Sequence, residues 1–498
     1  MKKILMSVAL VAGAATAAQA ADLPRKAPIL KAPIVQVYDW TGFYIGVNAG
    51  GSVGRDRTSL TTAVAGAPQS REQSYLSPIG AIGGGQIGYN WQFRNFYNLV
   101  LGVEADIQAS GQRDNSTCLL ACNVTQSASL LNQKIDWFGT ARVRAGIATG
   151  PVLSYITGGY AYGQTKTTDT LTLFTGAGAA GTTTSILTNN FTKGGYVIGS
   201  GVEAQLGGNW TAKIEYLYVN LGSSTSSLVI PSPLFGAGTA SQRTEIRDNI
   251  FRAGLNYRIG GNAAYTEPVG NWAGVYVGGN FGSIVARDRS TLTVPAAAAG
   301  VAGGITQSFN LVPDGFIGGG QIGYNWQAAA WVFGVEGDFQ GSTARDNKAC
   351  VAFCAPPTVA SNVALNQTLP WLATARGRLG YSVGSTLFYG TAGYAYGETR
   401  TRFTEVFGPL TGTAEIKRSK GGYVAGAGIE SPLTNIFGFF GPNWTSKTEY
   451  LFVDLGRTRN TFTAGTFAQT FTTRTEEHIF RTGINYHFNT PVAVVAKY

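Results

Sequence analysis

Charged and apolar residues alternate along short segments of this 498-residue chain, and this alternation is its most restrictive feature. In one segment Glu104 and Asp106 alternate with Val103, Ala105 and Ile107. Successive side chains of a β-strand point to opposite faces, so this segment predicts a strand with one charged and one apolar face. An Arg or Lys facing lipid at the bilayer centre costs about 2–4 kcal/mol. Charges confined to one face therefore predict a strand of a transmembrane β-barrel.

The same separation recurs in the other charged segments. Arg142 and Arg144 alternate with alanine and valine, and Lys213 and Glu215 alternate with alanine, isoleucine and tyrosine. An eight-stranded barrel is just wide enough for side chains to fill it, so we expect these charges to pair with one another in the lumen. A small polar conduit or gate is the alternative. The predicted lumen charges are Glu104, Asp106, Arg142, Arg144, Glu203, Lys213, Glu215, Arg252, Glu336, Asp338, Arg376, Arg378, Glu430, Lys447, Glu449 and Arg481.

The chain contains an internal repeat. Residues 83–91 (GGGQIGYNW) return unchanged as residues 318–326, which indicates an internal duplication. The stretch also matches the G-x-G-x-x-G fingerprint of dinucleotide-binding proteins, but that motif requires a helix after it. Here the alternation continues to Phe93. We therefore predict a strand, with glycine where a narrow barrel brings backbones close together.

Segments near the 9–11 residues of a tilted transmembrane strand are separated by connections of two lengths. We predict strands near residues 43–54, 81–93, 99–110, 136–148, 152–165, 195–206, 210–221 and 249–259. Long polar loops (55–80, 111–135, 166–194 and 222–248) alternate with short turns. Long outward loops and short periplasmic turns are typical of an outer-membrane barrel, whereas a soluble sandwich has no reason to sort its loops by length.

The start of the chain predicts export. Lys2 and Lys3, an apolar run and Ala18-Gln19-Ala20 describe a cleavable signal peptide. The predicted organisation is signal peptide 1–20, periplasmic lead-in 21–39, first eight-stranded barrel 40–259, linker 260–271, second barrel 272–488 and C-terminal tail 489–498. We favour two tandem barrels because the linker is longer than the other periplasmic turns and its end resembles the lead-in. One sixteen-stranded barrel is the alternative.

Composition constrains the partners. Charged residues make up 13% of the chain, against about 25% for a typical soluble protein. The net charge of +10 could attract nucleic acid, but the cations are scattered among acids, as in Arg55-Asp56-Arg57. We expect no nucleic-acid partner. The expected partners are outer-membrane lipid, lipopolysaccharide and the outer-membrane assembly machinery, and the partners of the outward loops are unknown.

Tryptophans gather near the predicted strand ends, where aromatic girdles meet lipid headgroups. The predicted girdle comprises Trp40, Trp91, Trp137, Trp210, Trp272, Trp326, Trp371 and Trp444.

Four cysteines in an exported chain favour disulfides. Cys118 and Cys122 lie in one predicted long loop, and Cys350 and Cys354 lie in the same loop of the second unit. We expect one small bridge in each loop. A zinc site needs four ligands, but neither loop has a nearby histidine, and a shared site would require the two loops to meet.

The histidines argue against catalysis. The only two are His478 and His487, and the first unit has Asn249 and Arg258 in their places. A histidine-dependent hydrolase or acyltransferase is therefore excluded in the first unit, and we expect His487 to be an interfacial residue at the periplasmic end. We predict no enzyme, no cofactor and no metal.

Several motifs carry a resemblance to a known family. They are residues 21–24 (ADLP), 40–46 (WTGFYIG), 85–91 (GQIGYNW) and 251–257 (FRAGLNY). With them the chain resembles the alphaproteobacterial outer-membrane immunogenic proteins, small eight-stranded barrels often labelled "porin family". The resemblance covers essentially the whole mature chain, twice over. It implies an outer-membrane location and surface-exposed loops with structural or antigenic roles, and it supplies no defined activity.

The tandem copy and the tail beyond Phe488 depart from the usual single barrel of this family. The function we favour is a non-enzymatic structural protein with a surface-antigen role. A porin-type channel for small hydrophilic solutes is the alternative.

Overall fold

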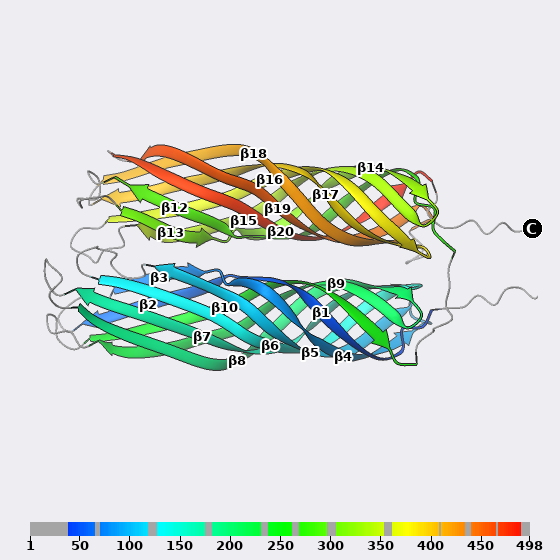
Figure 1. The fold of residues 1–498 in the computed structure, drawn as a ribbon, viewed down its shortest axis with the longest axis horizontal. Coiled ribbons are helices and arrows are strands. Elements are labelled where there is room, and N and C mark those ends of the chain that lie inside the picture. Colours follow the sequence, from blue (N-terminus) through cyan, green and yellow to red (C-terminus); the bar gives the residue numbers. More distant parts are fainter. Residues whose placement is uncertain are drawn as a thin grey trace, which may run out of the picture. The chain divides into compact units, whose positions relative to one another are not determined.

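Each half of the chain closes into its own antiparallel barrel in the computed structural model (Figure 1). Strands β1 to β10 form one sheet, closed by pairing of β1 with β10, and β11 to β20 form the other, closed by pairing of β11 with β20. No described strand of one sheet pairs with a strand of the other. The prediction of two tandem barrels, here named barrel one and barrel two, is confirmed, and the sixteen-stranded alternative is wrong.

The structure describes residues 38–64, 70–117, 127–174, 182–230, 238–260, 268–295, 305–352, 361–407, 410–433, 440–464 and 467–489. The predicted signal peptide, nearly all of the lead-in and the C-terminal tail, and most of the linker lie outside these residues. No helix among the described residues is long and apolar enough to cross a membrane.

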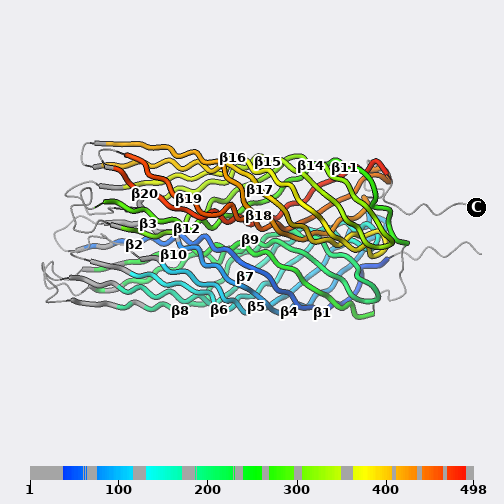
Figure 2. The backbone as a smooth tube through the Cα atoms, turned by 45° about the horizontal axis from the view of Figure 1, so that its top comes forward, coloured from blue at the N-terminus to red at the C-terminus, as the bar shows by residue number. Residues whose placement is uncertain are grey.

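The strands of barrel one are β1 (Gly42–Gly54), β2 (Asp56–Val64), β3 (Ser70–Leu76), β4 (Ile79–Phe93), β5 (Leu99–Thr117), β6 (Ser127–Thr149), β7 (Val152–Phe174), β8 (Thr182–Gly207), β9 (Trp210–Ile230) and β10 (Gly238–Arg258). Both β1 and β2 pair with β10, one after the other, and β4 continues the path of β3. The ten segments therefore ring the barrel as eight long strands, which tilt along it in Figure 2.

Barrel two repeats this layout. Its strands are β11 (Gly274–Ala286), β12 (Asp288–Val294), β13 (Ile305–Leu311), β14 (Asp314–Ala328), β15 (Trp331–Ala352), β16 (Ser361–Val383), β17 (Thr386–Phe407), β18 (Leu410–Pro432), β19 (Trp444–Ala464) and β20 (Phe467–His487).

The strands are much longer than the sequence analysis predicts. Strand β8 has 26 residues, and pairing between β6 and β7 continues from Thr149 out to Ser127. The predicted long loops are thus largely strand, and the expectation of loops at 55–80, 111–135, 166–194 and 222–248 is wrong for most of their length. Threonine-rich stretches such as the outer part of β7 (TKTTDTLTL) explain this, because β-branched residues fit a pleated surface even where they are polar.

The polarity of the wall reverses along barrel two. Near the short turns, the apolar side chain of Val335 is exposed and its neighbour Glu336 is buried. In the outer extension, the part of the strands beyond the predicted transmembrane segments, Phe403 is buried and Arg402 is exposed. The extension therefore has an apolar core, as a soluble barrel has, formed by Leu292, Val294, Leu311, Val363, Leu365, Phe403 and Phe471.

Register shifts separate the two regions. They fall between Thr368 and Trp371 where β16 meets β17, and between Asp454 and Gly456 where β19 meets β20. A bulge adds one residue to one strand, so the residues beyond it exchange faces. The extra residues lie in β16 and β19, so these two strands exchange faces there. Strand β17 keeps the same face outward from Tyr394 to Arg402 and changes polarity through its residue types.

Candidate functional site: the barrel lumen

Glu104 lies at the centre of a charge network inside barrel one. Lys213 Nζ is 2.9 and 3.0 Å from the two Glu104 oxygens, and the Tyr44 hydroxyl donates to Glu104 Oε2 at 2.7 Å. Arg142 also binds Glu104. The side chains of Lys213 and Glu104 are 0% and 3% exposed. This carboxylate is therefore fully engaged and screened from solvent.

A second carboxylate, Glu215, joins two arginines. Arg142 Nη1 donates to Glu215 Oε1 at 2.9 Å, and Arg252 Nε donates to Glu215 Oε2 at 2.8 Å. Both arginines also reach Asp106, at 3.0 and 2.9 Å. Because the residues come from β5, β6, β9 and β10, the network connects strands across the lumen.

Glu203 forms the part of the network nearest the short turns. It binds Arg144 Nη1 at 2.8 Å and accepts a hydrogen bond from Asn256 Nδ2 at 2.8 Å. With this pair the network contains four carboxylates and four cations, so it is electrically neutral. Its members are Glu104, Asp106, Glu203, Glu215, Arg142, Arg144, Lys213 and Arg252.

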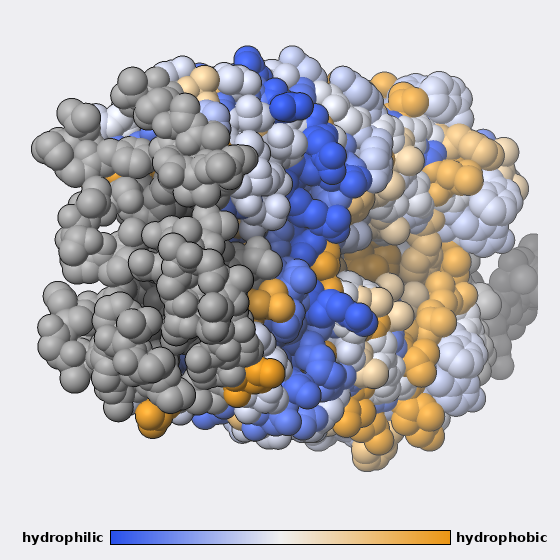
Figure 3. Space-filling model, turned by 60° about the vertical axis from the view of Figure 1, so that its left-hand side comes forward, coloured by the Kyte–Doolittle hydropathy of each residue, from blue (hydrophilic) through white to orange (hydrophobic). Residues whose placement is uncertain are grey.

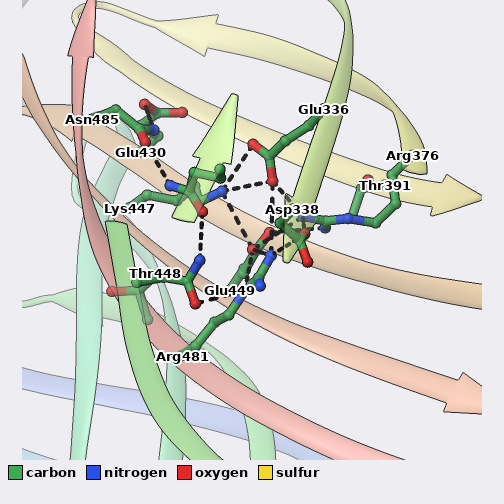
Figure 4. Close-up of polar contacts among 12 residues, drawn as sticks. Glu336, Asp338, Arg376, Thr391, Glu430, Lys447, Thr448, Glu449, Arg481 and Asn485 are labelled. Carbon is green, nitrogen blue, oxygen red and sulfur yellow. Dashed lines mark hydrogen bonds and ion pairs between the residues drawn. The ribbon is translucent and has the colours of Figure 1, made fainter. Parts of the chain in front are cut away.

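Barrel two repeats the network residue by residue (Figure 4). Lys447 Nζ is 2.8 Å from Glu336 Oε1, Arg481 Nη2 is 2.9 Å from Asp338, and Arg378 Nη2 is 2.8 Å from Glu430. Arg376 contacts Glu336, Asp338 and Glu449. All sixteen predicted lumen charges thus lie inside a barrel, eight in each.

His487 lies at the end of the last strand, β20, as predicted, but its ring points into the lumen. Its ring is 1% exposed, lies 3.1 Å from Glu430 and stacks on Tyr276 with ring centroids 5.2 Å apart. The expectation of an interfacial histidine is wrong, because His487 shares the inward face of β20 with Arg481 and Asn485. Barrel one has Arg258 at this position, with its guanidinium 5.6 Å from the Trp40 ring.

An apolar seal closes each network on the side of the short turns. Trp40 and Trp272, both predicted as girdle residues, are 0% exposed and pack in the lumen. Trp40 Nε1 donates to the Gly150 carbonyl at 3.1 Å, which holds the indole across the end of the barrel. The girdle prediction is wrong for these two residues, because both lie just before the first strand of their barrel, where the chain crosses the barrel end. The seals are formed by Tyr38, Trp40, Val100, Ala148, Leu153 and Tyr155, and by Trp272, Val332, Leu387 and Tyr389.

A second apolar layer lies on the outer side of each network. In barrel one, Leu217, Val219 and Leu221 continue the inward face that carries Lys213 and Glu215. They pack with Phe138 and residues of four further strands. Barrel two has an equivalent layer that includes Leu451, Val453 and Leu455. The sequence analysis missed these layers, although the spacing of two residues along β9 would have found them.

The other predicted girdle tryptophans remain at the wall. Trp91, Trp210 and Trp326 are exposed near the short turns. Trp137 packs edge-on against Tyr162, and Trp371 packs at a tilt against Tyr396, near the outer ends of the transmembrane segments. Trp444 is partly buried beside Tyr486.

The predicted disulfides lie beyond what the structure describes. Cys118, Cys122 and Cys354 fall outside the described residues, and Cys350 is near the end of β15. Both bridges stay predictions. Among the described residues, no group of three or more His, Cys, Asp or Glu side chains is placed to hold a metal ion.

Comparison with known proteins identifies the family. The model of the outer membrane protein beta-barrel domain matches residues 6–258 and again residues 259–488. The chain belongs to this family. It is therefore an outer-membrane β-barrel protein, and its two matches reflect the duplication.

Two similar proteins each match about half of the chain. The 31 kDa outer-membrane immunogenic protein of Brucella melitensis biotype 1 is 33% identical over 262 residues, which cover 52% of this chain and 100% of that protein. The 22 kDa outer membrane protein of Rhizobium leguminosarum bv. viciae is 28% identical over 234 residues, covering 45% of this chain and 82% of that protein. Both names agree with an outer-membrane location.

Among solved structures, Neisserial surface protein A is similar with a TM-score of 0.21 and 13% identity, covering 43% of this chain and 98% of that chain. A Pseudomonas aeruginosa FadL homologue has a TM-score of 0.28 and 9% identity, covering 90% of this chain and 91% of that chain.

Proposed function

We propose that this protein is a non-conducting structural component of the outer membrane that presents the outer ends of two barrels at the cell surface. One observation carries the proposal: in each barrel a neutral, buried charge network is enclosed between two apolar layers. Ions would have to cross both layers and separate paired charges. Separating them is costly, because removing one partner of a buried ion pair costs about 3–5 kcal/mol.

The same network argues against catalysis. Its carboxylates are bound to cations, and they also accept hydrogen bonds from the hydroxyls of Tyr44 and Tyr155. A general base must instead be within reach of a substrate proton. The histidines are also engaged, since His478 Nδ1 lies 2.8 Å from the Tyr450 hydroxyl and His487 lies beside Glu430.

Conductance tests this function directly. The full chain, refolded and added to a planar lipid bilayer, is expected to give no stable channels. Trp40→Ala together with Trp272→Ala removes the largest side chain of each periplasmic seal and serves as the comparison for leakage. Large, stable conductances from the unaltered chain would overturn the proposal and favour a porin.

Surface presentation is tested by a tag. An epitope inserted between β7 and β8 is expected to bind antibody on intact cells. The same epitope in the short turn between β6 and β7 is expected to bind only after the outer membrane is permeabilised. The reverse result would refute the proposed orientation.

A further inference from the structure

Five exposed cations lie on the outer wall of barrel two, on the neighbouring strands β17, β18 and β19. The side chains of Arg400, Arg402 and Lys417 are 45%, 64% and 59% exposed, and Arg457 and Arg459 are exposed as well. We name these five residues the cationic patch. It lies on the side of the barrel, five or more residues from the strand ends.

Some of the cations face one another. Arg400 is directly opposite Lys417 in the pairing of β17 with β18, and Arg457 is directly opposite Arg474 in the pairing of β19 with β20. Like charges directly opposite on one face of a sheet are destabilising. Arg474 is itself paired with Asp454 and Glu476, whereas Arg457 has no acidic partner among the described residues, so an external anion would relieve the remaining repulsion.

Acidic neighbours offset only part of the charge. Glu398 binds Arg400, and Glu415 lies 3.7 Å from Arg402 and 3.8 Å from Lys417. Arg457 and Arg459 form no ion pair with any residue that the structure describes. Five cations thus meet two carboxylates, and the patch keeps a positive excess.

The patch lies just beyond the lipid boundary. Tyr394, Tyr396 and Tyr423 are exposed on the same strands, and aromatic residues mark the membrane interface. Arg400 follows Tyr396 by four residues, which is about 13 Å along a strand and, with a tilt of about 40°, roughly 10 Å in height. A long Arg side chain at this height reaches the headgroup layer. Figure 3 shows a hydrophilic band next to the apolar surface.

Barrel one shows that the fold does not need four of these cations, although the counterpart of Arg400 is another cation, Lys166. The stretch YAYGETRTR in β17 corresponds to YAYGQTKTT in β7, so Thr168 stands in place of Arg402. Gly222 and Gly456 have nearly the same positive φ, 76° and 75°, and each follows a leucine. Ser223 and Thr225 therefore occupy the places of Arg457 and Arg459. By the shared GGY stretch, Asn190 takes the place of Lys417.

We propose that the cationic patch of barrel two binds the phosphate groups of lipopolysaccharide in the outer leaflet. Guanidinium groups bind phosphate through paired hydrogen bonds, and four of the five cations are arginines. The position on the side wall, level with headgroups, favours a lipid that surrounds the barrel over a soluble polyanion. The proposal rests on the outward orientation proposed above, which the epitope experiment tests separately.

The test replaces patch residues by their barrel-one counterparts. The variant Arg402→Thr, Lys417→Asn, Arg457→Ser, Arg459→Thr keeps side chains that the same fold already carries. Full-length protein in detergent is titrated with deep-rough lipopolysaccharide, and bound lipid is measured by mass spectrometry. The affinity of the variant for lipopolysaccharide is expected to fall about tenfold or more, since each exposed charge contact contributes up to about 1 kcal/mol. Arg243→Thr, an exposed cation of barrel one, is the matched control and is expected to bind like the unaltered chain.

Three further measurements identify the ligand group. Dephosphorylated lipopolysaccharide is expected to bind as weakly as the four-residue variant does to intact lipid, and added salt is expected to weaken binding because the contacts are exposed. Equal binding of intact lipid by the variant and the unaltered chain would overturn the proposal. A soluble sulfated polysaccharide that competes as well as lipopolysaccharide would also overturn it, because the surface would then bind soluble polyanions. Urea unfolding of the variant checks that its fold is retained.

Discussion

Replacing Lys213 by methionine tests whether the lumen network holds barrel one together. Lys213 Nζ lies 2.9 and 3.0 Å from the oxygens of Glu104 and 3.8 Å from Glu215, with a side chain that is 0% exposed. Methionine keeps most of the side-chain volume and removes the charge, leaving four carboxylates with three cations. Removing one partner of a buried pair costs about 3–5 kcal/mol. Since Arg142 still binds Glu104, we expect about 3 kcal/mol, or about two orders of magnitude in the folding equilibrium.

The measurement is urea unfolding of the full chain in lipid vesicles, followed by tryptophan fluorescence and by the mobility of folded protein in gels. Lys447→Met makes the same change in barrel two and shows which transition belongs to which barrel. Lys134→Met breaks an exposed pair with Asp136, 49% and 42% exposed, and is expected to cost less than about 1 kcal/mol.

A second variant separates charge from packing. Combining Lys213→Met with Glu104→Gln restores equal numbers of acids and cations, so the double variant is expected to be more stable than the sum of the single effects predicts. If Lys213→Met costs no more than the exposed control, or if the two effects simply add, the network does not stabilise the barrel as described.

Three other predictions concern glycine, pH and the independence of the barrels. A Cβ on Gly84 would collide with the Ile107 carbonyl oxygen, whereas a Cβ on Gly85 would lie 3.8 Å from its nearest neighbour, the Gly46 oxygen. Gly84→Ala should therefore lower the free energy of unfolding by about 1–3 kcal/mol and Gly85→Ala by less than about 0.5 kcal/mol, and equal urea midpoints would refute this. Burial raises the pKa of Asp169, in the outer extension, to about 6. Its protonated form thus favours folding below the ordinary pKa of 3.8, and up to about 3 kcal/mol is lost as the pH rises through about 6. Thermal unfolding from pH 4 to 7 should show this loss in the unaltered chain and not in Asp169→Asn; the same slope in both would contradict it. Residues 21–260 alone should fold in detergent, since the charge network of barrel one is complete within that part; a chain that stays unfolded there would show that barrel one depends on barrel two.

Alternation predicted the transmembrane architecture well because lipid imposes one rule on every strand. The neighbours of Glu104 and Arg142 face lipid, so the two-residue period is visible in the sequence. Beyond the membrane the rule no longer applies, and the two-residue period no longer shows which face is buried. In the outer extension, Phe403 faces a core and Arg402 faces water, and a bulge shifts the register between the two regions. The polar, threonine-rich sequence there looks like a loop unless pairing is known.

The lumen charges were predictable for the same reason, but the seals were not recognised. Trp40 is a tryptophan beside a predicted strand end, as a girdle residue would be. Only the path of the chain across the barrel end turns it inward. Leu217 and Val219 lie on the charged face of β9, where an apolar residue looks like a lipid-facing one unless the two-residue spacing from Lys213 and Glu215 is followed outward.

The neutrality of each network also bears on how a chain with two barrels could arise. Four acids and four cations cancel within barrel one, and a second set cancels within barrel two, without a charge borrowed from the other copy. A gene duplication that fused two such units would need no compensating substitutions in either interior. The exposed walls could then diverge under separate selection, as the serines and threonines of one copy and the arginines of the other have done.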